Sequence, residues 1–350
     1  MTDARIDNRL VAKGLAGVVV DETAISDVRS EGVLTYRGIT IEQLVEKSLS
    51  QVVHLLLDAE VPVSLSPLTE QELAWVLALP RDLHPMQVLQ AAVPILQTNA
   101  QENLLLGCEI ANKLPTLLLS YLHGRAVVPD ESDYARAFLS GLNGVSPSLD
   151  QAAAFTTVQI LQLEHSFNAG TFAARVVAST LATLPAAISA GFGALSGPLH
   201  GGADQRALEL IDGLASRSAI DAYIDETLKA NGRIPGMGHR EYRRRDPRAV
   251  ILEEWAIRLS NGSPHAETYA RLKYLEESFA ERMSARGKDV YANVEFYKGL
   301  VYRMLGLPND YFTAGFALAR VFGYIAHFVE SRVDNKIFRP QATYVGRKAS

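Results

Sequence analysis

Three of the eight histidines stand at breaks in the helical sequence pattern, where a side chain can face a cleft. They are His165 in LEHSFNAGT, His200 in SGPLHGGAD and His239 in GMGHREYRRRDPR. Rigid elements on either side of such a break can hold a side chain in place for chemistry. The glycines beside His200 and His239 also let another group approach closely. One such histidine is more often a structural hydrogen bonder, and three in similar settings weaken that interpretation without identifying a reaction.

A metal site is the alternative role for these histidines, and the sequence does not favour it. Zinc sites built on helices use short spacings such as H-E-x-x-H. No such motif occurs here, and the three histidines are 35 and 39 residues apart. Cys108 is the single cysteine, which excludes a cysteine-cluster metal site and an intramolecular disulfide. We therefore expect no metal.

Arginines are concentrated around His239 in an otherwise acidic chain. Guanidinium groups bind carboxylates and phosphates through two parallel hydrogen bonds, so this cluster suggests an anionic small molecule, with a solvated helix start as the plain alternative. The net charge of −5 and the lack of interleaved aromatic residues disfavour nucleic acid. Arg320 and Arg339 are isolated cations in an apolar region, where a carboxylate or a substrate should meet them. The cluster consists of Arg233, Arg240, Arg243, Arg244, Arg245 and Arg248.

Glu295 is a further candidate, because it follows a turn at Gly287 and begins an apolar helix. A carboxylate at this position could act as a general base. It could equally be a first-turn acid favoured by the helix dipole, and the residues alone favour that simpler role.

The elements that position these residues are mainly helices. The chain has 350 residues, 48% of them hydrophobic, which excludes intrinsic disorder and provides a core for two domains of about 150 residues. Residues 17–38 predict a small N-terminal β-hairpin, and the lack of β-α alternation argues against a parallel-sheet nucleotide fold. Capping boxes at Thr40 and Thr69 begin the first helices. Helical patterns are predicted at 41–57, 70–79, 84–98, 102–121, 132–142, 150–163, 168–190, 203–230, 247–260, 266–286, 295–305 and 310–333.

Two segments bear on location and domain organisation. Val176 to Ala203 carries no charge and could span a bilayer of about 30 Å, but its small residues and two prolines favour a closely packed buried helix. The polar N-terminus is no secretory signal, so we expect a cytoplasmic protein without a membrane span. Charged helices follow residue 201, which suggests a smaller domain inserted into a larger one with a hinge at Gly201–Gly202. A single domain with a polar outer layer explains the change equally well.

Nearly the whole chain resembles the citrate synthase family. The resemblance rests on segments that occur in the family's order: GLAGVVVDETAISDV, VLTYRGITIEQL, HSFNAGTFAARVVAST, GPLHGGA, GMGHREY, DPRA, NVEFY, LARVFGYIAHFVES and IFRPQATYVG. It implies a multi-helical two-domain fold, with residues 1–202 and 308–350 in a large domain and 203–307 in a small one. It also implies a homodimer with shared active sites, whose domains close over the substrates.

The resemblance implies a reaction and roles for individual residues. Family members deprotonate the methyl group of acetyl-CoA, add the enol to oxaloacetate and hydrolyse the citryl thioester, and the CoA thioester is a substrate, so no cofactor is expected. His200 would donate a hydrogen bond to the thioester oxygen, and His239 would donate one to the oxaloacetate carbonyl. The remaining matches are His165, Arg248 and Arg320 for oxaloacetate, Arg339 for the partner subunit's site and, less specifically, Arg243 and Arg244 for the CoA phosphates.

Two positions depart from the family pattern. Glu295 stands where the family has an aspartate as the methyl-abstracting base, and its extra methylene moves the carboxylate by roughly 1 Å, which can change the rate on the order of 10²-fold. Ser166-Phe167 after His165 replaces an acidic or small residue and leucine. Three activities therefore stay open: citrate synthesis, 2-methylcitrate synthesis from propionyl-CoA, and a weakened homologue with a binding or regulatory role.

Overall fold

The computed structural model describes residues 12–347 apart from residue 16 and residues 129–130, and its fold is mainly helical, as predicted. Short 3-10 helices occur at Lys13–Leu15, Val93–Ile95 and Asn309–Tyr311. The α-helices are α1 (Ile41–Leu44), α2 (Leu49–Leu57), α3 (Glu70–Ala78), α4 (Pro85–Ala92), α5 (Asn103–His123), α6 (Tyr134–Asn143), α7 (Leu149–Gln162), α8 (Ala169–Ser179), α9 (Leu184–Leu195), α10 (Ala203–Gly213), α11 (Arg217–Lys229), α12 (Pro247–Ser260), α13 (Ala266–Ser284), α14 (Val294–Met304) and α15 (Phe312–Val333).

The predicted hairpin is present and is extended by a third short strand. Strands β1 (Ser26–Arg29), β2 (Val33–Tyr36) and β3 (Ile39–Thr40) form an antiparallel sheet in that order. Ser26 pairs with Tyr36 at one end of the hairpin. Tyr36 is fully buried, so one face of the sheet packs into the molecule and fixes the register.

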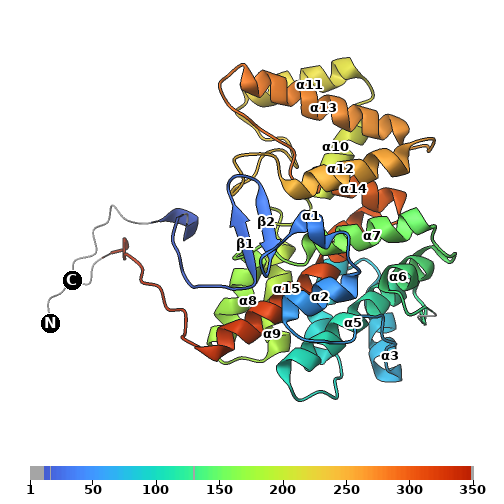
Figure 1. Cartoon of the computed structure of the whole chain (residues 1–350), viewed down its shortest axis with the longest axis vertical. Coiled ribbons are helices and arrows are strands. Elements are labelled where there is room, and N and C mark those ends of the chain that lie inside the picture. The colour runs from blue at the N-terminus through green and yellow to red at the C-terminus, as the bar shows by residue number, and fades with distance from the viewer. Residues whose placement is uncertain (1–11, 16, 129–130, 348–350) are drawn as a thin grey trace.

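Helix α15 lies at the centre of the core. Its residues from Phe312 to Phe328 are all buried, and α2, α5, α7, α8 and α9 pack around it (Figure 1). The segment Asn309–Val333 is long and apolar enough to cross a membrane, but 94% of its most apolar window is buried inside the protein. A helix enclosed in this way is a core helix, and its apolar surface is covered by neighbouring side chains.

The uncharged segment from Val176 to Ala203 packs closely through the buried faces of its helical parts, while Leu181 and Leu199 are exposed, and it is not one helix. Leu181 has a positive φ of 66°, which ends the helical path after α8. Thr183 then begins α9, with Pro185 in its first turn, where proline is well tolerated. The expectation of a single helix over 168–190 was wrong for this reason.

Two other expected helices are also divided where a capping residue intervenes. Ser48 begins α2 with its own capping box, so the predicted helix over 41–57 becomes α1 and α2. Ser216 caps α11 and separates it from α10. Serine side-chain oxygens accept hydrogen bonds from the free N–H groups of a new helix, so dividing a helix at a serine costs little free energy. The predicted box at Thr69 is present, because Thr69 N donates to Glu72 Oε2 at 2.7 Å.

Helices α10 to α14 gather at one end of the molecule, and the hairpin lies between them and the larger group of helices (Figure 1). Within this end, α10 and α12 both pack against α14. One continuous cluster of buried apolar side chains extends through both parts. The predicted domain boundaries at residues 202–203 and 307–308 stay a prediction.

Gly191→Ala tests the close packing of α9 on α15. A methyl group added at Gly191 would lie 2.6 Å from Cε2 of Tyr324, whose fully buried ring has no room to move. Overpacking costs about 1–3 kcal/mol, so we expect the free energy of unfolding in urea to fall by that amount. Gly213→Ala is the matched control, since a methyl group there meets nothing within 4 Å. Equal stability of the two variants would contradict a tight helix contact.

Candidate active site

The structure brings together two predicted histidines and two predicted arginines from separate parts of the chain. The ring centroids of His165 and His239 are 5.4 Å apart. Arg248 Nη2 lies 3.4 Å from His239 Nε2. Burial lowers the pKa of His165 well below its ordinary value, and the charges of Arg248, His239 and Arg320 lower it further. The four side chains therefore form one electrostatic unit.

The loop that carries His239 fixes the orientation of its ring. The backbone N–H groups of Glu241 and Tyr242 both donate to His239 Nδ1 at 3.1 Å. Because Nδ1 accepts, the proton of the neutral ring lies on Nε2. Burial, together with the charge of Arg248, lowers the pKa of His239 to about 4. His239 is therefore a neutral hydrogen-bond donor at neutral pH.

Arg248 is held in a buried, two-point ion pair with Asp246. Its Nε donates to Asp246 Oδ1 at 3.0 Å and its Nη2 donates to Oδ2 at 2.8 Å. Asp246 also caps α12 and accepts a hydrogen bond from Val294 N at 3.1 Å. Burial raises the pKa of Asp246, but the Arg248 charge outweighs it and the pKa is lowered overall. One carboxylate thus fixes a cation and joins the starts of α12 and α14.

Arg320 is a second buried cation, and most of its donors are left free. It is 1% exposed, its Nε donates to the Gln162 carbonyl at 2.7 Å, and its guanidinium lies 4.7 Å from the ring centroid of Phe316. Its Nη1 and Nη2 atoms make no hydrogen bond within the described part of the chain. Burial lowers the pKa of Arg320, the charge of Glu164 opposes this, and the charge of Arg248 lowers it further. Two converging buried cations suit a dicarboxylate.

The hairpin supports the segment that carries His165. Tyr36 Oη donates to the Glu164 carbonyl at 3.1 Å, and Ser26 Oγ donates to Glu164 Oε1 at 3.1 Å. His165 Nε2 lies 3.0 Å from Tyr242 Oη. Burial raises the pKa of the Tyr242 phenol, so Tyr242 keeps its proton. The hairpin and the His239 loop therefore both fix His165.

His200 lies beside the N-terminus of α8. Its Nε2 is 3.3 Å from the Gly170 N–H and 3.2 Å from Asn168 Oδ1, the oxygen that caps α8. Burial lowers the pKa of His200 to about 4, with help from the charges of Arg320 and Lys298. His200 is therefore neutral. One of its two ring nitrogens, Nε2, lies against both the Gly170 N–H and Asn168 Oδ1 at the start of α8.

Glu295 lies in the first turn of α14, as its sequence position suggested, but it is also buried and paired. Asn293 Oδ1 caps the helix by accepting from Glu295 N at 2.9 Å. The residue is 8% exposed, and its Oε1 accepts from Lys298 Nζ at 2.7 Å. Its buried Oε2 has no hydrogen-bond partner among the described residues. An acid favoured only by the helix dipole would not need to be buried with one carboxylate oxygen unpaired, so this simpler role does not explain the environment of Glu295.

Arg243 and Arg244 are exposed and line a small pocket of about 180 Å³ together with His239. Arg243 N donates to the Ser30 carbonyl in the hairpin turn at 2.8 Å. The backbone of this arginine segment is therefore tied to the hairpin, while the two guanidinium groups face solvent. The position suits an anionic group that extends out of the site.

Arg339 is the one predicted residue that the structure does not bring to the others. It is exposed, and it donates to the adjacent Pro340 carbonyl at 2.9 Å. Phe338 N donates to Ser179 Oγ at the far end of α8 from Asn168, about 16 Å away along an 11-residue helix. The segment after α15 extends away from the helices (Figure 1).

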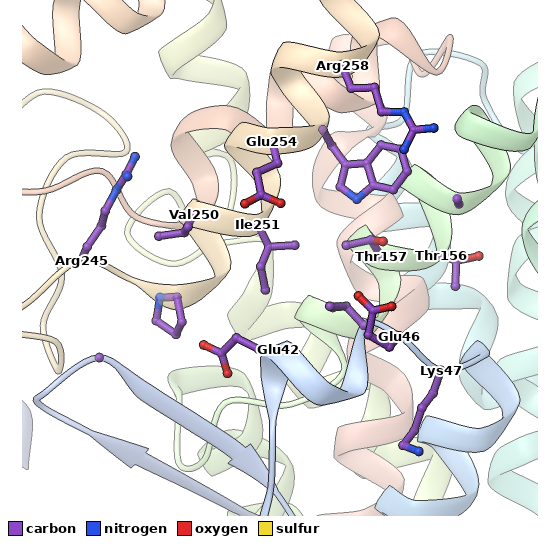
Figure 2. A pocket seen from close by; sticks show the side chains of 15 residues that line it. Glu42, Glu46, Lys47, Thr156, Thr157, Arg245, Val250, Ile251, Glu254 and Arg258 are labelled. Carbon is purple, nitrogen blue, oxygen red and sulfur yellow. The ribbon is translucent and has the colours of Figure 1, made fainter.

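A larger cleft of about 950 Å³ lies elsewhere, between α1, α7 and α12. Figure 2 shows Glu42, Glu46 and Glu254 around it. The two arginines that line it are paired with acids: Arg245 with Glu253, and Arg258 with Asp150. A cleft without a free guanidinium does not match the anionic ligand that the arginine cluster predicts. Arg245 is the one member of that cluster that lines it.

Sequence reasoning missed several polar residues of the site. Asp246 and Asn168 stand at helix-cap positions inside recognised motifs, and that cap pattern was the available signal. Lys298 and Asp204 gave no signal, because lysine and aspartate side chains in helices are normally solvated. Within the described residues, no group of three or more His, Cys, Asp or Glu side chains is placed to hold a metal ion.

Comparisons with known proteins identify the family to which this chain is similar. Residues 14–341 match the family model described as "Citrate synthase, C-terminal domain". A citrate synthase of Deinococcus radiodurans is 33% identical, over 97% of this chain and 96% of its own. A 2-methylcitrate synthase of Shewanella oneidensis is also 33% identical, over 99% and 97%.

A solved structure has the same fold. The ternary complex of a Thermoplasma acidophilum citrate synthase with carboxymethyl coenzyme A and oxaloacetate has a TM-score of 0.89 to this chain and is 27% identical, over 97% of each chain. The family match, the full-length relatives and the shared fold all point the same way. The chain belongs to the citrate synthase family, and it is an enzyme of that family.

Proposed function

We propose that this protein condenses acetyl-CoA with oxaloacetate to form citrate and CoA. The observation that carries the proposal is the convergence of the neutral donor His239 with the buried cations Arg248 and Arg320. This set matches a dicarboxylate with a ketone beside one carboxylate. The solved complex of a relative with oxaloacetate and a CoA analogue supports the same substrates.

Oxaloacetate would be bound and polarised by these groups. Arg248 and Arg320 bind its carboxylates, and His165 adds a further contact. The Nε2–H of His239 donates to the ketone oxygen, which becomes negative as the new bond forms. A fixed donor in a water-poor site stabilises such a charge more than water does.

The thioester would be activated by Glu295 and His200 acting together. The free Oε2 of Glu295 takes a proton from the methyl carbon. His200, in the neutral tautomer that carries its proton on Nδ1, donates from that atom to the thioester oxygen as the enol forms. A carbon acid this weak needs the base and the donor at the same time.

The enol carbon then attacks the ketone carbon, the π electrons of the ketone move to its oxygen, and that oxygen takes up one proton, equivalent to the one that Glu295 removed, to become the hydroxyl of the citryl thioester. Water then attacks the thioester carbon and the C–S bond breaks, giving the carboxylate of citrate, the thiol of CoA and one released proton. Exposed Arg243 and Arg244 are the groups proposed for the CoA phosphates, and closure of the two domains keeps the enol from water.

Propionyl-CoA is the second candidate substrate, because relatives of similar identity are 2-methylcitrate synthases. One methylene in a pocket changes binding by only about 1–3 kcal/mol. We further propose a cytoplasmic homodimer, in which the outstretched segment after α15 carries Arg339 to the partner's site. The exposure of Arg339 and its purely local hydrogen bond support this assignment.

Thiol release identifies the reaction and the acyl donor. The purified protein is assayed with oxaloacetate and either acetyl-CoA or propionyl-CoA, and we expect faster release from acetyl-CoA. Arg320→Met should abolish most turnover at low oxaloacetate, because it removes a buried cation. Release that favours propionyl-CoA would assign 2-methylcitrate synthesis. Negligible release by the unaltered protein, recovered in Glu295→Asp, would indicate a homologue adapted to binding.

The depressed pKa values of His200 and His239 predict how the site responds to acid. Since both are about 4, against an ordinary value near 6.5, both rings should stay neutral down to about pH 5. The unfolded chain binds these protons first, so the histidines make the protein less stable as the pH falls from 6.5 towards 4. Imidazole resonances, assigned with His200→Gln and His239→Gln, provide the measurement. A titration midpoint near 6.5 for either ring would contradict the neutral assignment.

Mixed dimers test the placement of Arg339. His239→Ala and Arg339→Ala chains should each be nearly inactive alone, because each disables both sites of its own dimer. A heterodimer carries one site with both residues intact, so co-expression with two different tags should restore part of the activity. Verified heterodimers without any activity would place Arg339 outside the partner's site.

A further inference from the structure

We propose that Lys298 is a positioning residue for Glu295: it holds one carboxylate oxygen, leaves the other free for the substrate proton, and compensates the buried charge of Asp204. The inference rests on the proposed function, because it takes Glu295 to be the base. It assigns a role to a fully buried lysine that the reaction scheme above does not use.

The contacts of Lys298 are unusual for a lysine. The side chain is 0% exposed, and the residues on either side of it in α14 are buried as well. Its Nζ donates to Glu295 Oε1 at 2.7 Å and to Gln162 Oε1 at 3.1 Å, and it lies 3.2 Å from Asp204 Oδ2. The ammonium also lies 4.4 Å from the ring centroid of Phe316. A buried lysine needs such partners to stay charged.

The backbone brings Asp204 to this position. A methyl group added at Gly299 would lie 2.7 Å from the Asp204 carbonyl oxygen. Only glycine lets α10 and α14 approach this closely. Gly299, the residue after Lys298 in α14, thus allows the Asp204 carboxylate to face Lys298. Gly299 and Lys298 act together to build the cluster.

The titratable groups around the cluster come from four parts of the chain. Asp204 comes from α10, Arg320 from α15 and His200 from the loop before α10, and Tyr302 lies one helical turn along α14 from Lys298. Burial raises the pKa of Asp204; Lys298 opposes this and the charge of Glu295 adds to it. Helices α12 and α13 present Glu253 and Glu276 to Tyr297 instead.

Two consequences follow for the base. The Glu295 side chain is one methylene longer than that of aspartate and has more rotamers. The ion pair with Lys298 selects one of them, so the longer side chain stays ordered. The ammonium also compensates the charges of two buried carboxylates, those of Glu295 and Asp204. Without it, two carboxylates would face each other in a poorly solvated site, and one of them would hold a proton. A protonated Glu295 accepts no proton from a methyl group.

Lys298→Met tests this arrangement, because it keeps the length of the side chain and removes the charge. With the full-length protein and the thiol-release assay, we expect kcat at pH 7 to fall by about 10²-fold with little change in the KM for oxaloacetate. The acid limb of the kcat profile should move to higher pH, because a positive charge beside the carboxylates is lost. In Lys298→Met/Asp204→Asn the limb should move back, because only one buried carboxylate is left.

Lys113→Met is the matched control, since Lys113 forms a similar ion pair with Glu72 at 2.8 Å, far along the chain from the site residues. It should lose stability and keep the wild-type acid limb. If Lys298→Met does not fold, Glu295→Asp provides the test: the shorter carboxylate draws away from Nζ, so kcat should fall below wild type. An unchanged acid limb in Lys298→Met, no return in the double variant, or a faster Glu295→Asp enzyme would overturn the proposal. An inactive wild-type protein would overturn the proposed function as well.

Discussion

The buried ion pair between Arg248 and Asp246 is the interaction on which the site depends. A guanidinium is costly to bury alone, and its two hydrogen bonds to one carboxylate offset that cost. The same carboxylate caps α12 and accepts from Val294 N, the first residue of α14. The position of a substrate-binding cation and the position of the helix that carries Glu295 are therefore set by one side chain. Loss of Asp246 would leave the buried Arg248 charge without its partner. It would also remove hydrogen bonds from the first turns of α12 and α14.

Around this ion pair, the other functional groups are buried but keep hydrogen-bond donors or acceptors that have no partner. Arg320 uses one of its donors on the Gln162 carbonyl, and Glu295 leaves Oε2 free. His200 and His239 are buried far enough to be neutral at physiological pH. His327 is fully buried, and its ring nitrogens lie 2.9 Å from Glu164 Oε1 and 3.0 Å from Arg175 Nη1. His327 therefore has hydrogen-bond partners at both ring nitrogens, whereas Arg320 and Glu295 keep unpaired polar atoms where a substrate can use them.

The sequence predicted the helical fold, the hairpin and the residues that converge, because motif spacing and apolar periodicity are local properties. It did not predict the turn at Leu181, where a non-glycine residue adopts a positive φ that the surrounding packing imposes. It also did not predict the contact of Lys298 with Asp204, which are 94 residues apart and meet only because α10 packs on α14 at Gly299. Ion pairs between helices depend on tertiary packing, which no local pattern contains.

This contact changes how the departure at Glu295 is understood. Taken alone, a glutamate in place of aspartate is a base with a carboxylate about 1 Å out of position. Taken with Lys298 one helical turn later and Asp204 opposite, it is part of a buried cluster whose geometry suits the longer side chain. Correct placement of a base requires that its other rotamers be excluded, and a 2.7 Å ion pair to a lysine that is itself held by Gln162 does this. The three charged residues are therefore best regarded as one unit, in which the identity of each depends on the other two.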